Sequence, residues 1–271
     1  MAEPQVFRWQ IGDVEVVRVV DDDFALPSDR PVPEWCVGDL SPSRDEVGIA
    51  FSALAVAAGG THIVIDPWLA NDGPREGPDA GERADQLLGR LAEAGFPPDE
   101  VDIVVNTHLD GIGWNTRPDG DDGWRLSFPN ARYLYPGDEV VAIDAGRPIT
   151  GHEGFARLTQ LVDVESVAPP TTLAPGVELV DAPGHNFGHL AVRVESDDAL
   201  ALYPGHLILT PFDIADPDAD RSEPPNGHLA PSSRRRMLGE LADRGGTLLT
   251  TLLGGSGSGR VARAGSGFSL S

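Results

Sequence analysis

Apolar residues along the chain fall mostly into short runs that alternate with turn residues, a pattern that predicts β-strands. Two pairs of runs predict hairpins, and the clearer pair has Gly59 and Gly60 between its strands. Two successive glycines allow the positive φ angles of a tight hairpin turn. A proline-rich stretch over residues 26–35 is expected to form a surface loop. The predicted strands are residues 6–9, 14–20, 51–58, 61–65, 101–106, 177–181, 190–195, 199–203 and 247–253.

Three other windows carry apolar residues at helical spacing: residues 84–94, 155–162 and 237–241. Gly95 ends the first predicted helix and Gly245 ends the third, as glycine commonly does after the last turn. Strands interspersed with helices predict an α/β protein with layered sheet and helix packing. Neither an internal repeat nor a long linker divides the chain, so we expect a single domain over residues 1–271.

Composition excludes several classes of function. The 271 residues carry 43 acidic and 20 basic side chains, a net charge of −23 that repels phosphate backbones, so we expect no nucleic-acid partner. The longest apolar runs are too short to span a membrane, and the first residues lack the features of a secretory signal. We therefore expect a cytoplasmic protein with no membrane partner. Cys36, the single cysteine, is expected to be a small apolar filler, and the three arginines 234–236 to meet solvent or the acidic surface.

Three of the seven histidines come shortly after a predicted strand. They are His108, His185 and His206, and the last two follow a Pro-Gly pair. Rigid strands that lead into short loops bring residues from distant parts of a sequence together. We expect the three imidazoles to converge on one site, with Asp110 close by.

Several motifs occur in an order that resembles one known family. Residues 102–116 read Asp-Ile-Val-Val-Asn-Thr-His-Leu-Asp-Gly-Ile-Gly-Trp-Asn-Thr, and residues 128–133 read Phe-Pro-Asn-Ala-Arg-Tyr. Asp66 precedes these motifs, and residues 183–189 and 259–261 follow them as Pro-Gly-His-Asn-Phe-Gly-His and Gly-Arg-Val. The succession resembles the metallo-β-lactamase superfamily, and in particular its lactonase-like branch of bacterial hydrolases. This resemblance implies an αββα sandwich of the metallo-β-lactamase fold.

The resemblance also implies a ligand set that this sequence only partly keeps. Members of the branch hold two metal ions with seven ligands, of which His108, Asp110 and His185 match. His206 stands where the resemblance implies a bridging Asp, and Leu252 where it implies the last His. Two adjacent cations need an anionic bridge to offset their repulsion, so we expect no dinuclear centre.

Two types of site remain open. His108, His185 and His206 could hold a single zinc, iron or manganese ion, because three imidazoles and a water form a known catalytic zinc arrangement. Alternatively the site holds no metal, and the same histidines act as acid and base while Asp110 fixes the tautomer of an imidazole. His189 occupies a position from which it could orient His185 or a bound anion.

Each type of site favours a different reaction on a small carbonyl compound. A single metal ion favours a hydrolase of a lactone, ester or thioester. A metal-free site favours a cyclase, lyase or isomerase of specialised metabolism, in which the substrate supplies its own activation. A third hypothesis is a non-catalytic binding protein, since a fold alone does not determine function. Nothing in the sequence specifies the oligomeric state.

Overall fold

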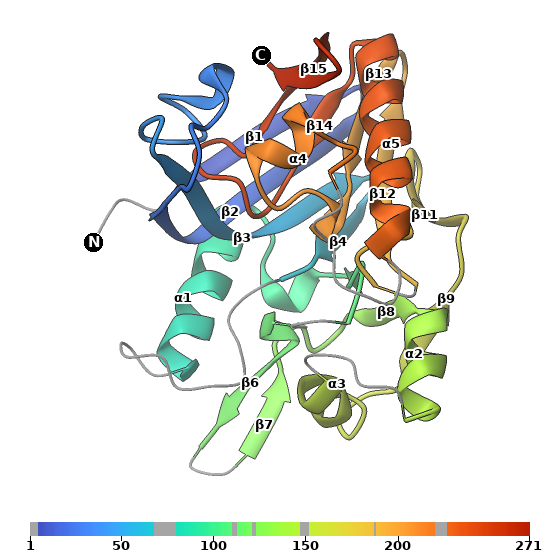
Figure 1. Cartoon of the computed structure of the whole chain (residues 1–271). Coiled ribbons are helices and arrows are strands. Elements are labelled where there is room, and N and C mark those ends of the chain that lie inside the picture. Colours follow the sequence, from blue (N-terminus) through green and yellow to red (C-terminus); the bar gives the residue numbers. More distant parts are fainter. Residues whose placement is uncertain are drawn as a thin grey trace. The chain divides into compact units, whose positions relative to one another are not determined.

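The computed structural model describes residues 5–67, 80–109, 113–120, 123–146, 152–186, 188–219 and 227–271. These residues form two seven-stranded sheets and a separate two-stranded hairpin (Figure 1). The strand orders are β1-β2-β3-β4-β5-β8-β9 and β10-β11-β12-β13-β14-β15-β16. The chain divides into two compact units: unit 1 is Met1–Trp9, Glu15–Asp21 and Ser52–Ala168, and unit 2 is Gln10–Val14, Asp22–Phe51 and Pro169–Ser271.

The strands are β1 (Val6–Ile11), β2 (Val14–Pro27), β3 (Glu46–Ala58), β4 (Thr61–Ile65), β5 (Ile103–Val105), β6 (Thr116–Asp119), β7 (Gly123–Leu126), β8 (Arg132–Pro136), β9 (Val164–Val167), β10 (Thr171–Ala174), β11 (Val177–Asp181), β12 (Leu190–Ser196), β13 (Ala199–Tyr203), β14 (Thr247–Leu249), β15 (Ser258–Ala264) and β16 (Gly267–Leu270). The α-helices are α1 (Ala80–Glu93), α2 (Gly137–Asp144), α3 (His152–Leu158), α4 (Pro211–Ala215) and α5 (Ala230–Arg244). Short 3₁₀ turns include η3 (Gly113–Asn115) and η4 (Gly205–Leu207).

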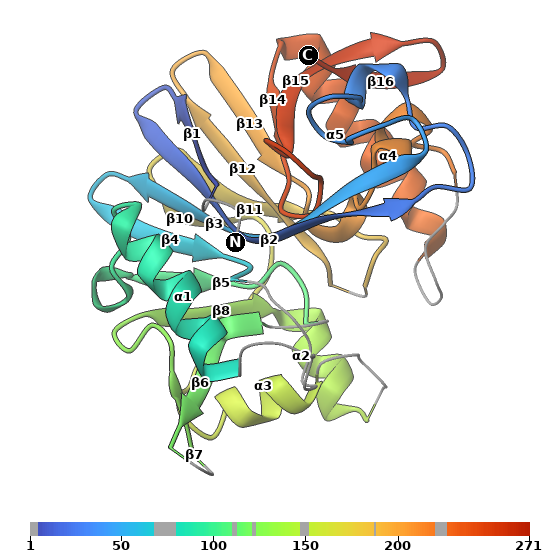
Figure 2. The same cartoon turned by 90° about the vertical axis from the view of Figure 1, so that its left-hand side faces the viewer.

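Unit 1 contains a group of parallel strands that end at one edge. The hairpin β3–β4 turns at Gly59 and Gly60, whose φ angles are 58° and 84°, as its sequence predicted. From β4 onward the strands β4, β5, β8 and β9 pair in parallel. The hairpin β6–β7 contacts helices α1 and α3 (Figure 2). Parallel pairing places the residues that follow β4, β5 and β8 beside one another.

Unit 2 pairs its strands antiparallel except at one step. Strands β10 to β13 form an antiparallel run, β13 pairs with β14 in parallel, and β14 to β16 are antiparallel again. Helix α5 contacts β13, β14 and β15. It buries Met237, Leu238 and Leu241 in a hydrophobic cluster, to which Cys36 and Phe268 also belong. This apolar face is the one that the helical spacing predicts.

Most predicted elements are present, with several corrections. The second predicted helix was expected to reach residue 162, but α3 ends at Leu158. Strand β2 runs to Pro27, so the expected loop starts later than predicted. Helices α2 and α4 and the hairpin β6–β7 were not predicted. No helix in the described part of the chain is long and apolar enough to cross a membrane.

Two predictions for single residues had opposite outcomes. Cys36 is fully buried, its thiol donates to the Pro33 carbonyl at 2.8 Å, and burial raises its pKa, so its role as an apolar filler is confirmed. Arg234 was expected to meet solvent or the acidic surface, but only 3% of it is exposed. That prediction was wrong because a run of three arginines at a helix start does not reveal which one turns inward.

Candidate functional site

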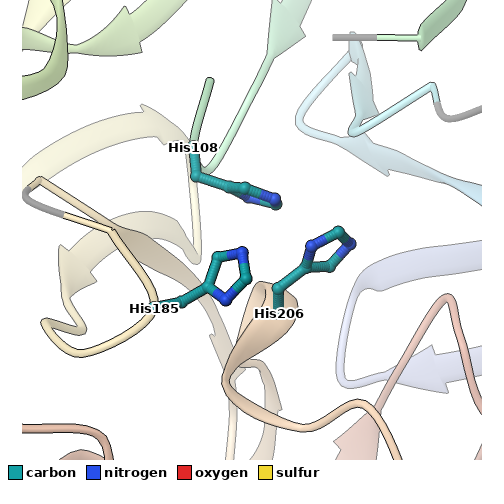
Figure 3. Close-up of side chains that lie close together, drawn as sticks. All are labelled: His108, His185 and His206. Carbon is teal, nitrogen blue, oxygen red and sulfur yellow. The ribbon is translucent and has the colours of Figure 1, made fainter. Parts of the chain in front are cut away.

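His185 and His206 lie together in unit 2. Strands β11 and β13 both pair antiparallel with β12, so they run in the same direction and end at the same edge of the sheet. His185 comes four residues after β11, and His206 three residues after β13. Their ring centroids are 5.1 Å apart and their planes are at 80° (Figure 3). The sheet therefore explains why two residues 21 positions apart meet.

His189 contacts both residues of this pair and is fully buried. Its Nδ1 lies 3.1 Å from the Ala182 carbonyl oxygen, and the backbone N–H of His206 donates to its Nε2 at 3.1 Å. Because a carbonyl only accepts and an amide N–H only donates, Nδ1 carries the proton and the ring is neutral. Its ring also meets His185 edge-on, with centroids 5.6 Å apart. The hydrogen bonds of His189 thus hold the backbone of His206 and the Ala182 carbonyl, which precedes the turn of His185. Its predicted role in orienting the His185 ring or a bound anion stays a prediction.

The loop that carries His185 depends on glycine. Gly184 has a φ of 143°, and a Cβ there would lie 2.4 Å from the backbone of Ala230 at the start of α5. Ser233 of the same helix donates its hydroxyl proton to the Pro183 carbonyl at 2.6 Å. The Pro-Gly pair before His185 therefore lets the loop pass close to α5, which fixes the start of the histidine-bearing turn.

His108 lies in unit 1, three residues after β5, and is 4% exposed. Asp66, which follows β4, accepts the Thr107 backbone N–H at 2.8 Å and the Thr107 hydroxyl at 2.6 Å. Since Thr107 gives its only hydroxyl proton to Asp66, its oxygen accepts from His108 Nδ1, which lies 3.0 Å away. This chain of bonds places the proton of His108 on Nδ1, so Nε2 is the ring nitrogen that carries the lone pair.

A buried carboxylate that the sequence did not single out also supports this loop. Glu139 on α2 is fully buried, and its Oε2 accepts the backbone N–H of Leu109 at 2.6 Å. No local pattern indicated this residue, because α2 itself was not predicted. Asp110, the predicted orienting acid, lies outside the described residues.

Among the described residues, no other histidine groups with His108, His185 and His206 as a possible metal ligand. His62 packs against the ring of Phe96, with centroids 5.2 Å apart, and His228 is exposed. Phe212 of α4 is partly buried beneath Arg30, whose Cζ lies 3.9 Å from the ring centroid. Leu252, at the position where the family resemblance implies a histidine, is 7% exposed.

Solved structures with the same fold were found by comparison, whereas no family model matches the chain. AidC, a dizinc quorum-quenching lactonase, is 19% identical, with 99% of this chain and 97% of that chain covered and a TM-score of 0.73. The hydrolase AbOPH of the beta lactamase superfamily is 17% identical, with coverages of 100% and 98% and a TM-score of 0.70. A quorum-quenching N-acyl homoserine lactone lactonase is 14% identical, with coverages of 91% and 94% and a TM-score of 0.55. The predicted fold class is confirmed: this α/β chain has the fold of the metallo-β-lactamase superfamily.

Proposed function

We propose that this protein is an enzyme of the metallo-β-lactamase superfamily that hydrolyses a small lactone, ester or thioester with one divalent metal ion. His108, His185 and His206 are the proposed ligands. The observation that carries the proposal is the grouping of their rings: each side chain labelled in Figure 3 offers one nitrogen, and these nitrogens lie within 4.8 Å of one another. Three neutral imidazoles suit zinc, and imidazole also binds iron.

The three proposed ligands suit one ion better than two. The proposed ligands include no carboxylate, since His206 stands where the resemblance implies the bridging Asp. A second ion would also lack a histidine ligand, because Leu252 stands where the resemblance implies the last His. A buried apolar side chain cannot supply a donor atom. Two divalent ions without an anionic bridge repel each other strongly. The dizinc centre of AidC is therefore not proposed for this chain.

A divalent ion at this place would polarise a substrate carbonyl and lower the pKa of water toward neutrality. Hydrogen bonds within the chain fix two of the proposed ligands, His108 and His206. Asp66 and Thr107 keep the proton of His108 on Nδ1, so its Nε2 carries the lone pair that a metal ion would bind. His189 fixes the backbone of His206 in the same way that outer hydrogen bonds fix metal ligands in other sites.

The metal-free alternative is favoured by the same hydrogen-bond chain. An imidazole whose Nδ1 is held by a hydroxyl bonded to a carboxylate is equipped to take up a proton at Nε2. In this second proposal His108 and His206 exchange protons with a reactive carbonyl compound, and the reaction is a cyclisation, elimination, isomerisation or decarboxylation. Asp66, through Thr107, then serves the orienting role that the sequence assigned to Asp110.

Elemental analysis of protein purified without added metal and without chelator separates these proposals. We expect about one equivalent of zinc, iron or manganese per chain, and loss of that metal in His206→Ala but not in the exposed-histidine control His228→Ala. Two equivalents would overturn the single-ion proposal. A negligible metal content, with carbonyl chemistry that still depends on His206, would transfer support to the metal-free enzyme. If the metal content were negligible and His206→Ala changed no activity, the binding-protein hypothesis would replace both.

A further inference from the structure

A buried guanidinium in unit 2 contacts the segment that follows His206. Arg234 projects from the second turn of α5 and is 3% exposed. Its Nε donates to the Pro217 carbonyl at 3.0 Å, and its Nη2 donates to the Ala219 carbonyl. Its Nη1 reaches the carbonyl of Leu207 and the carboxylate of Asp213, both at 3.5 Å. One side chain thus contacts four points of the segment that follows His206.

The carboxylate of Asp213, which belongs to the same segment, accepts hydrogen bonds from other residues of that segment. Its Oδ2 accepts the backbone N–H groups of Leu209 and Thr210, at 3.1 and 2.9 Å, and the Thr210 hydroxyl at 3.0 Å. These bonds cap α4, where Thr210 and Asp213 form a capping box. The other carboxylate oxygen faces Arg234, with an Nη1 to Oδ1 distance of 3.5 Å. The backbone from residue 207 to 219 is therefore folded around one guanidinium.

We propose that Arg234 is a positioning residue for His206. The guanidinium contacts the carbonyl of Leu207, the residue that directly follows His206. The backbone of His206 is held on one side by the His189 ring and followed on the other by Leu207, whose carbonyl Arg234 contacts. These two attachments fix the 3₁₀ turn Gly205–Leu207 that directs the His206 imidazole toward His185. The proposal rests on the proposed function of His206 as a ligand or as an acid–base group.

An arginine is required because its planar group offers five N–H donors in fixed directions. Lysine would keep the positive charge near Asp213, but its three donors radiate from one nitrogen and could not reach Leu207, Pro217 and Ala219 together. Arg235, the next residue, provides a matched comparison. It binds Asp218 of the same segment from outside, with Nε to Oδ1 at 2.7 Å, and its side chain is 42% exposed.

The test compares Arg234→Lys with Arg235→Lys in the full-length protein. Circular dichroism first establishes that both variants are folded at the temperature of the assay. We expect the Kd for zinc to rise at least tenfold in Arg234→Lys. Replacing a residue that holds a metal ligand in place typically weakens metal binding by about 10- to 100-fold. We also expect the visible absorption of bound cobalt to change, and we expect Arg235→Lys to match the wild type in both measurements. Unchanged zinc affinity and an unchanged cobalt spectrum in Arg234→Lys would overturn the proposal.

A second measurement distinguishes this proposal from the proposed metal site. If the wild type binds no zinc, the single-ion function fails, and the ring nitrogen signals of His206 in ¹⁵N NMR become the readout. They are identified by their loss in His206→Gln. A shift of these signals in Arg234→Lys, with none in Arg235→Lys, supports positioning without metal, and no shift contradicts it. If Arg234→Lys does not fold, Asp213→Asn is measured in its place, with the same expected effects and the same contradicting outcomes.

Discussion

The Nε2 atom of His189 accepts the backbone N–H of His206 over 3.1 Å, so one buried histidine holds the main chain of another. The opposite nitrogen of the ring donates to the Ala182 carbonyl, which belongs to the loop that leads to His185. His189 therefore connects the two loops that carry the candidate ligands of unit 2. A ring with both nitrogens engaged in this way remains neutral and serves to fix the loops.

Replacing His189 by Phe keeps an aromatic ring but removes both hydrogen bonds. Each lost bond to a buried backbone group is expected to cost about 1–3 kcal/mol of unfolding free energy. We also expect zinc affinity to fall about 10- to 100-fold, because the backbone of His206 is no longer held. Urea unfolding and zinc titration measure the two effects, and His228→Phe, at an exposed position, is the control. An unchanged zinc affinity would show that His189 only fills space.

The hydroxyl of Thr107 is the link between Asp66 and His108, so Thr107→Val isolates its contribution. The two side chains have the same shape, but valine cannot donate to Asp66 or accept from His108 Nδ1. We expect a loss of about 1–3 kcal/mol in unfolding free energy and a mixture of His108 tautomers in ¹⁵N NMR. Thr107→Ser should restore most of both properties. Retention of the single Nδ1–H tautomer in Thr107→Val would contradict the proposed chain.

Local sequence patterns predicted the strands and helices that bury a regular apolar face. The hairpin β3–β4 was predicted from Gly59 and Gly60 because a turn with two positive φ angles has few alternatives. Helix α2 was missed because its residues include Gly137 at the start and the buried charged residue Glu139, and only packing in unit 1 explains that burial. The prediction of one domain over residues 1–271 stays a prediction.

The candidate site was predictable as a set of strand ends, but not as a network of hydrogen bonds. The Pro-Gly pairs before His185 and His206 indicated loops at the ends of β11 and β13, and the pairing with β12 brings the two loops together. Arg234 and Glu139 could not be identified in this way, because burial of a charge depends on tertiary partners that lie far away in the sequence. Charged side chains are expected at the surface unless such partners exist.

The two tyrosines of β8 are both buried but differ in their hydrogen bonds. The Tyr133 hydroxyl accepts from the Phe128 N–H at 3.2 Å and donates to the Phe128 carbonyl at 3.1 Å. The Tyr135 hydroxyl has no hydrogen-bond partner among the described residues, and burial raises its pKa well above the usual value. Tyr133→Phe is therefore expected to lose about 1–3 kcal/mol of unfolding free energy, whereas Tyr135→Phe should lose nothing and could gain up to about 1 kcal/mol. Urea unfolding measures both, and equal losses would contradict the difference.

Alanine in place of Gly184 should be among the most damaging small substitutions in unit 2. The added Cβ would meet the Ala230 backbone at 2.4 Å, at a φ of 143° that residues with a Cβ rarely adopt. Overpacking of this kind costs about 1–3 kcal/mol, and the backbone strain adds to it. Gly89→Ala is the matched control, since nothing lies within 4 Å of a Cβ there and alanine favours a helix by about 0.5–1 kcal/mol. Chemical unfolding should show loss for Gly184→Ala and a small gain for Gly89→Ala, and equal effects would exclude the steric explanation.

Glu195 makes a small contribution to stability that depends on pH, because hydrogen bonds from Arg244 and Arg193 lower its pKa to about 2. A carboxyl with a lower pKa in the folded state stabilises the protein above its unfolded pKa of about 4.3, and this stabilisation is lost as the pH falls toward 2. Because the side chain is 36% exposed, solvent screening limits the effect to less than about 1 kcal/mol.

Glu195→Gln should therefore be less stable than the wild type at pH 7, and the difference should shrink steadily below about pH 4.3. Unfolding free energies from urea titrations between pH 7 and pH 3 measure this convergence. Glu178→Gln, on the neighbouring strand β11, is the control, because Glu178 lies opposite Arg193 in the strand register, whereas Arg193 forms its ion pairs among the described residues with Glu195 and Glu240. A stability difference for Glu195→Gln that is constant over this pH range would mean that the lost interaction does not depend on the carboxylate charge, and the ion pairs with Arg244 and Arg193 would then contribute nothing measurable.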